Sequence, residues 1–411
     1  MTSSNKTFTD GPNFHLNACV GENTGGDSDY GYVKGFAQAV FVLLSAAQSE
    51  TFADPVTGEA DWAYMDALIY PLGFCARHYI ELFLKRQIRV VGSIRKQKAP
   101  AEAKGHDLSS LWGELVTACS TDKRLAVKLQ PMAEYVNDFA SIDSTGQTFR
   151  YQHDAESGVK HLKKMGRINL QGLAKRFKEL EGLAEDFDNY SAGVAYEYSW
   201  GTYTSKLSRA DLYEIAERLP HRSDWGGDEF CLIAQELKNT FSLGSNDFSR
   251  AIKLIQSHRE FSAMVGVEIP LDHISAEVFE RIKNFDPRTR HPIEFSRQEL
   301  AVLNAIYEAS PPHEYSEAYD HVFADSLSSE FGRALLPSDV VRTIRNHSIR
   351  FRKGLAKLGQ KTLLSAFELT FTPEPEPEPS EQERQKAMEH YELDIKSQLE
   401  SLILFKPSKT K

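Results

Sequence analysis

Residues 68–84, LIYPLGFCARHYIELFL, carry the helical pattern around which the N-terminal half of the chain is organised. At about 100° per residue, the apolar side chains of this stretch fall on one face of a helix that continues beyond it. Three charged side chains, Arg77, Glu81 and Lys85, recur every helical turn and stack on the opposite face. The stretch therefore predicts an amphipathic helix with an ordered polar face. Pro71 either starts this helix or kinks a longer one.

The composition is that of an ordinary globular protein, with 41% hydrophobic and 26% charged residues among 411. A chain of this length has room for two domains with separate cores. The net charge of −10 argues against a protein that coats nucleic acid, although it leaves room for a local basic site. The cysteines form no CxxC pair, the longest apolar run is too short to cross a membrane, and the start has no signal-peptide pattern. These features predict a cytoplasmic protein without a metal, a cofactor or a membrane segment.

Helical periodicity recurs along almost the whole chain and predicts an all-α fold with two domains. The aromatic, β-prone segment at residues 196–203 marks the passage between them. The expected division is an irregular arm at 1–30, a bundle of about six helices at 31–195, and a second, mostly helical domain at 196–371.

Capping residues and a linker organise the C-terminal half. Ser296 opens a capping box before an apolar helix, and Ser338 is expected to cap a helix that runs from Asp339 to about residue 358. Residues 372–380, TPEPEPEPS, predict a stiff, extended linker because proline fixes φ and the glutamates repel one another. The last segment, 381–411, has a helical pattern whose apolar stripe, over 381–405, must be buried by self-association, by a partner protein or against the chain itself.

Two further motifs follow the polar helix face. The segment Gly-His-Asp-Leu at 105–108 indicates a helix start with Asp107 as its N-cap. The segment Phe-Arg-Tyr at 149–151 then precedes the last long helix of the first domain. Each feature also has a structural interpretation. The polar face can be an exposed ladder of ion pairs, His106 and Asp107 a cap and a turn, and Arg150 a cation that holds helix C-termini.

In this order, over residues 31–190, the three features resemble the HEPN superfamily of prokaryotic helical domains. The resemblance implies a compact helical bundle that commonly dimerises. Its active members are metal-independent endoribonucleases of toxin–antitoxin and antiviral defence systems, whereas others bind RNA or nucleotides or serve as interaction domains. The active members carry an arginine followed, about five to seven positions later, by a histidine. Arg342 and His347, in the second domain, are the pair that fits this spacing.

A metal-independent ribonuclease needs a base for the ribose 2′-OH and a cation for the phosphate. On the resemblance, the arginines of the first domain bind phosphate, and a histidine exchanges the protons. The expected catalytic residues are Arg77, His106, Arg150 and His153, Lys85 is expected to contact nucleic acid, and the structural polar face comprises Glu81, Asp107 and Tyr151.

A second basic segment lies at residues 341–361, which contain arginines and lysines but no acid. In a chain of negative net charge, this local excess indicates contact with a phosphate backbone. The alternative is a solvated face balanced by the acidic linker nearby. The nucleic-acid-binding residues expected in this segment are Arg342, Arg345, His347, Arg350 and Arg352.

The sequence therefore predicts a HEPN-like protein that acts on or binds RNA or a nucleotide, that forms a homodimer, and that contacts a protein partner through residues 381–405. The prediction includes a metal-independent endoribonuclease as its enzymatic form. The alternative, from a different class, is a non-catalytic interaction or ligand-sensing module of helical fold.

Overall fold

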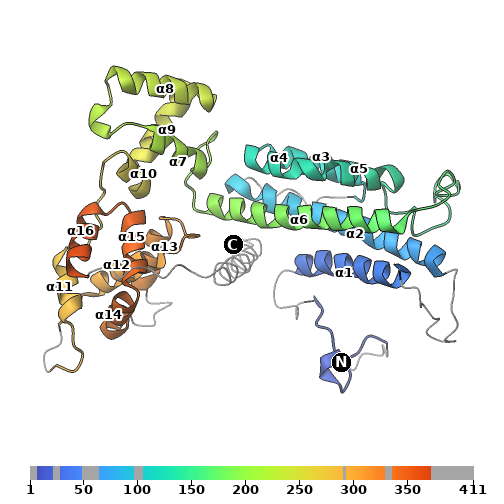
Figure 1. Cartoon of the computed structure of the whole chain (residues 1–411), viewed down its shortest axis with the longest axis horizontal. Coiled ribbons are helices and arrows are strands. Elements are labelled where there is room, and N and C mark those ends of the chain that lie inside the picture. The colour runs from blue at the N-terminus through green and yellow to red at the C-terminus, as the bar shows by residue number, and fades with distance from the viewer. Residues whose placement is uncertain are drawn as a thin grey trace, which may run out of the picture. The chain divides into compact units, whose positions relative to one another are not determined.

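The computed structural model describes residues 7–21, 28–48, 64–96, 105–289, 293–328 and 336–371. In these ranges the secondary structure is helical, apart from one isolated bridge between His153 and Lys160, so the all-α prediction is confirmed. The chain divides into two compact units, which meet in sequence at Tyr196 and Glu197 (Figure 1). The predicted linker and C-terminal helix lie outside the described residues.

Unit 1 is a layered bundle built on the long helix α2 (Tyr64–Gly92). Pro71 lies inside α2, which is therefore one continuous helix. The prediction of a β-prone segment at residues 196–203 is wrong up to residue 199. Tyr196 and Tyr198 are buried side chains in the last turns of a helix. Helix α6 (Leu170–Ser199) runs beside α2 in the middle of the bundle (Figure 1). On one side of this pair lies α1 (Ser28–Gln48), and on the other lie α3 (Leu108–Cys119), α4 (Lys123–Leu129) and α5 (Ala133–Ile142).

The aromatic core of unit 1 lies where α2 meets α1 and α6. The ring of Phe177 on α6 contacts Tyr79 on α2 and Phe41 on α1, at centroid distances of 5.3 and 5.5 Å. Further along, Phe83 and Phe187 meet at 6.3 Å. These edge-to-face contacts bury the apolar face that the sequence predicts for the central helix.

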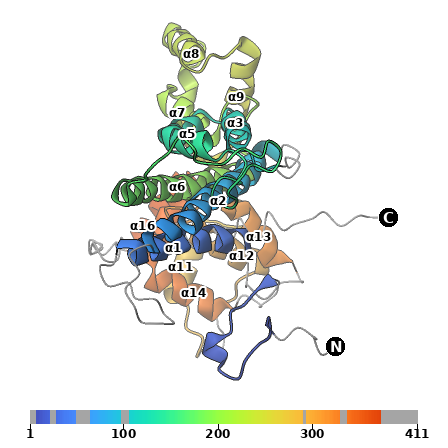
Figure 2. The same ribbon diagram turned by 90° about the vertical axis from the view of Figure 1, so that its right-hand side faces the viewer.

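Unit 2 contains two groups of helices, each with its own apolar core (Figures 1 and 2). Ser296 forms the predicted capping box at the start of the helix Arg297–Glu308. The first group is α7 (Arg209–Arg218), α8 (Asp228–Thr240), α9 (Ser245–Ser257) and α10 (Arg259–Met264). The second is α11 (Glu277–Asn284), α12 (Arg297–Glu308), α13 (Ala318–Leu327), α14 (Pro337–Asn346), α15 (Ser348–Lys357) and α16 (Lys361–Thr370).

The single helix expected over residues 338–358 is wrong, because α14 and α15 are separate. The expected cap is wrong as well, because α14 begins at Pro337, before Ser338. The backbone leaves the helical region at His347, where φ is −128° and ψ is 43°. No glycine or proline marks the break. It allows Ile344 of α14 and Phe351 of α15 to enter the same core from different directions.

Gly354 of α15 lies at a close approach of two helices in unit 2. A Cβ atom at this position would lie 2.1 Å from the carbonyl oxygen of Ile306 on α12. Gly354→Ala therefore forces the helices apart, and we expect the free energy of unfolding to fall by about 1–3 kcal/mol in urea titrations. The matched control is Gly113→Ala on α3, where a Cβ meets open space and the change should stabilise by about 0.5–1 kcal/mol. Equal stability of the two variants would contradict this packing.

Candidate functional site

The polar face of α2 is buried. Arg77 and Glu81 are 1% and 2% exposed, because α3 and the loop after α5 cover this face. The interpretation as an exposed ladder of ion pairs is therefore wrong for these two residues. Lys85 alone of the three reaches the surface, with 21% of its side chain exposed.

Arg77 uses its guanidinium to hold backbone from two other segments. Nε donates to the carbonyl oxygen of Asp143 at 3.2 Å, and Nη2 donates to that of Ser144 at 2.8 Å. Nη2 also donates to the carbonyl oxygen of His106. These bonds tie the end of α5 and the start of α3 to α2. With 2% of its side chain exposed, Arg77 offers almost no surface to a phosphate.

The carboxylate of Glu81 is the centre of the site. Its Oε1 accepts a hydrogen bond from Lys85 Nζ at 2.7 Å and lies 2.8 Å from His106 Nδ1. Its Oε2 accepts from Arg77 and lies 3.9 Å from Nδ1 of His78. Burial alone would raise the pKa of this carboxyl group, but its four partners hold the pKa well below the usual range. We call Arg77, His78, Glu81, Lys85 and His106 the Glu81 cluster.

His106 has one ring nitrogen inside the cluster and one outside it. Because an ionised carboxylate only accepts hydrogen bonds, Nδ1 of His106 must donate to Glu81, which orients the ring. The side chain is 71% exposed, so Nε2 is available to a ligand. The next residue, Asp107, accepts a hydrogen bond from Ser110 N at 2.7 Å and is the predicted N-cap of α3.

His78 and two aromatic side chains extend the site, and sequence reasoning missed them. His78 stacks on Phe74 with ring centroids 5.5 Å apart, and Phe36 of α1 meets its edge at 4.5 Å. The guanidinium of Arg150 lies 5.5 Å above Phe74 and 5.2 Å from the ring of Tyr151. Arg150 is thus connected to the cluster through a stacked pair on α2. The signal available in the sequence was the spacing of Phe74 and His78, one helical turn apart.

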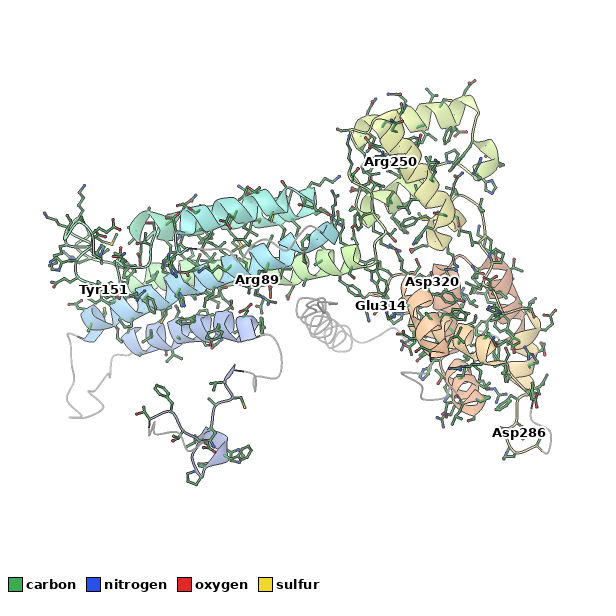
Figure 3. All side chains as sticks on the ribbon, turned by 180° about the vertical axis from the view of Figure 1, so that it is seen from behind. Arg89, Tyr151, Arg250, Asp286, Glu314 and Asp320 are labelled. Carbon is green, nitrogen blue, oxygen red and sulfur yellow. The ribbon has the colours of Figure 1, made fainter. Side chains whose placement is uncertain are left out.

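The remaining residues expected in the first domain lie on the loop between α5 and α6. Tyr151 is exposed at one end of unit 1 (Figure 3), and its hydroxyl accepts a hydrogen bond from Arg150 at 3.1 Å. His153 is also exposed, and its backbone pairs with Lys160. In the described part of the chain, no side-chain contact joins His153 to the Glu81 cluster. The structure therefore connects Arg150 with the cluster and leaves His153 outside it.

The arginines of the basic segment at 341–361 form hydrogen bonds and ion pairs with other residues of unit 2. Arg345 donates to carbonyl oxygens at the C-terminal end of α11, including that of Phe285 at 2.8 Å. This favours the interpretation as a balanced face, although the balancing groups belong to unit 2. The other contacts are Arg342 with Asp339 at 2.9 Å, Arg350 with Ser310 at 2.9 Å and Glu308 at 3.7 Å, Arg352 with Glu368, and the ring of His347 at 6.1 Å from that of Tyr307.

Within the described ranges, no group of three or more His, Cys, Asp or Glu side chains is placed to hold a metal ion. No helix in the same ranges is both long and apolar enough to cross a membrane. No family model matches the sequence, and no curated protein or solved structure matches it significantly. The functional interpretation therefore depends on the geometry of the Glu81 cluster itself.

Glu81→Gln tests whether the carboxylate holds the cluster together. The change leaves Arg77 buried without its counterion, so we expect the free energy of unfolding at neutral pH to fall by about 3–5 kcal/mol. The folded-state pKa of Glu81 is lowered from 4.5, so its contribution is complete above that pH and is lost as the pH falls toward the folded-state pKa. Denaturant titrations across this pH range should show the loss in the parent protein and not in the variant.

A matched control for this measurement is Glu185→Gln on α6. Glu185 is exposed and pairs with Lys34 at 2.7 Å, so its removal should cost less than about 1 kcal/mol and add little pH dependence. Similar losses for Glu81→Gln and Glu185→Gln would show that the buried carboxylate does not hold the cluster.

Proposed function

We propose that unit 1 binds single-stranded RNA or a nucleotide through the exposed side of the Glu81 cluster, and that it cleaves RNA without a metal ion. One observation carries the proposal. Two imidazoles from different segments, His78 and His106, meet at one buried carboxylate, next to an arginine stacked on an aromatic ring. Cations and aromatic rings on one surface are suited to the phosphates and bases of a single strand. The HEPN resemblance of the sequence supports the same function.

In this proposal His106 supplies the acid–base chemistry. With Nδ1 held by Glu81, Nε2 takes the proton of a ribose 2′-OH, and the 2′ oxygen attacks the adjacent phosphorus. The bond from phosphorus to the 5′ oxygen breaks, and His78, in its protonated form, gives that oxygen a proton. The products are a 2′,3′-cyclic phosphate and a 5′-hydroxyl end. Arg150 binds the phosphate, because a guanidinium can donate two parallel hydrogen bonds to it.

The second candidate, a non-catalytic interaction or ligand-sensing module, is favoured by a different observation. Two arginines expected to bind phosphate, Arg77 and Arg345, donate instead to backbone carbonyl oxygens at helix ends. In that case the cluster is a structural contact that happens to reach the surface, and the protein neither binds nor cleaves RNA.

Only the sequence supports the proposals about the biological setting. Homodimerisation, a cytoplasmic location and a role in antiviral defence or a toxin–antitoxin pair stay predictions. The same holds for a protein partner at residues 381–405, which lie outside the described residues.

Replacing the exposed imidazole separates the two candidates. Purified full-length protein is incubated with an end-labelled RNA oligonucleotide in excess EDTA, and the products are resolved by gel electrophoresis. We expect cleavage that leaves 2′,3′-cyclic ends, and we expect His106→Gln to slow it by about 100-fold or more, the usual contribution of acid–base catalysis. Arg150→Gln should weaken binding of a 2′-O-methyl RNA, which cannot be cleaved, in fluorescence anisotropy.

The matched control is His153→Gln, a change at an exposed histidine of the same unit outside the cluster. This variant should cleave at the parental rate. If His153→Gln abolishes cleavage and His106→Gln does not, the acid–base group is His153 and the assignment to the cluster is wrong. If the parent protein leaves RNA intact and does not bind it, the non-catalytic module is the better description.

A further inference from the structure

Unit 1 contains a cavity that the Glu81 cluster does not use. It lies between α2, α5 and the loop that leads into α6, and its volume is about 320 Å³. Small-molecule sites occupy about 300–1,000 Å³, so the cavity is large enough for a ligand. Its apolar walls include Ile69, Phe139, Ile142, Phe149, Ile168 and Leu173.

Two glycines shape this cavity. A Cβ atom on Gly73 of α2 would lie 2.5 Å from the ring of Phe149, so the absence of a side chain at this position lets the ring form a wall. Gly172, in the first turn of α6, also lines the cavity, and the nearest atom to a Cβ there is Asn169 Oδ1 at 3.7 Å. Gly172 is exposed, so a side chain added there has room at the edge of the cavity.

The loop that borders the cavity is basic. Arg167 lines the cavity, and Lys160, Lys163 and Lys164 precede it in the same loop, with all four side chains exposed. In the described part of the chain, none of the four forms a salt bridge with an acid. The other two charged lining residues form an ion pair at 2.7 Å and balance each other. Among the described residues, the apolar cavity therefore has one cation without an ion-pair partner in its lining, Arg167, in a loop that carries three further lysines.

We propose that this cavity binds an anionic amphiphile, a fatty acid or a related acyl chain, with its carboxylate at Arg167 and its methylenes between the apolar walls. Such walls would leave the hydrogen-bonding edges of a nucleobase without partners, which favours an alkyl chain over a nucleotide. The basic loop selects an anionic head group over a neutral or cationic one. The site is separate from the proposed ribonuclease and does not depend on it.

Isothermal titration calorimetry of the full-length protein with alkyl carboxylates, below their micellar concentrations, tests the proposal. From hexanoate upward, each added methylene should tighten binding by about 4-fold until the cavity is full, after which the affinity levels off. Decanol and decyltrimethylammonium should bind about 10-fold more weakly than decanoate, because they lack the charge-assisted hydrogen bond to Arg167.

Gly172→Leu adds a side chain at a residue that lines the edge of the cavity and should weaken decanoate binding by about 10-fold or more, while the loss of a helical glycine keeps the protein at least as stable. The matched control is Gly182→Leu on the same helix, where the added side chain meets open space and binding should persist. Arg167→Gln changes an exposed side chain outside any helix, so it leaves the fold intact. It should weaken decanoate by about 10-fold and leave decanol unaffected.

Results of three kinds would overturn the proposal. The first is a Gly172→Leu protein that binds decanoate like the parent. The second is decyltrimethylammonium binding as tightly as decanoate, or no carboxylate binding at all. The third uses adenosine monophosphate as the competing probe: if it displaces decanoate and Gly172→Leu removes its binding, the cavity is a nucleotide site.

Discussion

One buried carboxylate sets how the segments of unit 1 join. Glu81 is ionised and 2% exposed, so its charge must be compensated inside the bundle. Arg77 and Lys85 supply the compensating charge from α2 itself, and His106, in the segment before α3, adds a hydrogen bond from Nδ1. Arg77 then reaches the carbonyl oxygen of Asp143, after α5. Apolar packing is non-directional. We therefore infer that this polar contact decides where the two loops meet the central helix.

Unit 2 uses arginine in the same way. Arg209, at the start of α7, is 6% exposed and pairs with Glu260 of α10 and, at 2.9 Å, with Glu317 before α13, so it joins the two helix groups. Burial would raise the pKa of Glu317, but His258 and Arg209 hold it well below the usual range. Arg345 similarly closes the end of α11. The fold explains each of these arginines, which makes them poor candidates for contacts with a ligand.

How far the sequence could predict this structure depends on how local each interaction is. Asp107 and Ser296 cap the expected helices because a cap involves only neighbouring residues. The burial of Arg77 was not predictable in that way, since hydropathy assigns a polar face to solvent and cannot show that another helix covers it. Likewise, Tyr198 belongs to a β-prone segment that packing keeps helical, and the break at His347 has no glycine or proline to indicate it.

The candidate site, too, could be predicted from the sequence only in part. Order along the chain grouped Arg77, His106 and Arg150, but His78 escaped notice because neighbours on a helix point about 100° apart. These residues also differ in whether they can bind a ligand without giving up a contact that the fold needs. If Arg77 turned to a phosphate, it would leave buried carbonyl oxygens unsatisfied, at a cost of about 1–3 kcal/mol each. An exposed imidazole that uses only one nitrogen in the fold loses nothing when the other binds a ligand. On this criterion the proposed chemistry belongs to His106 and Arg150, and Arg77 belongs to the framework that holds them.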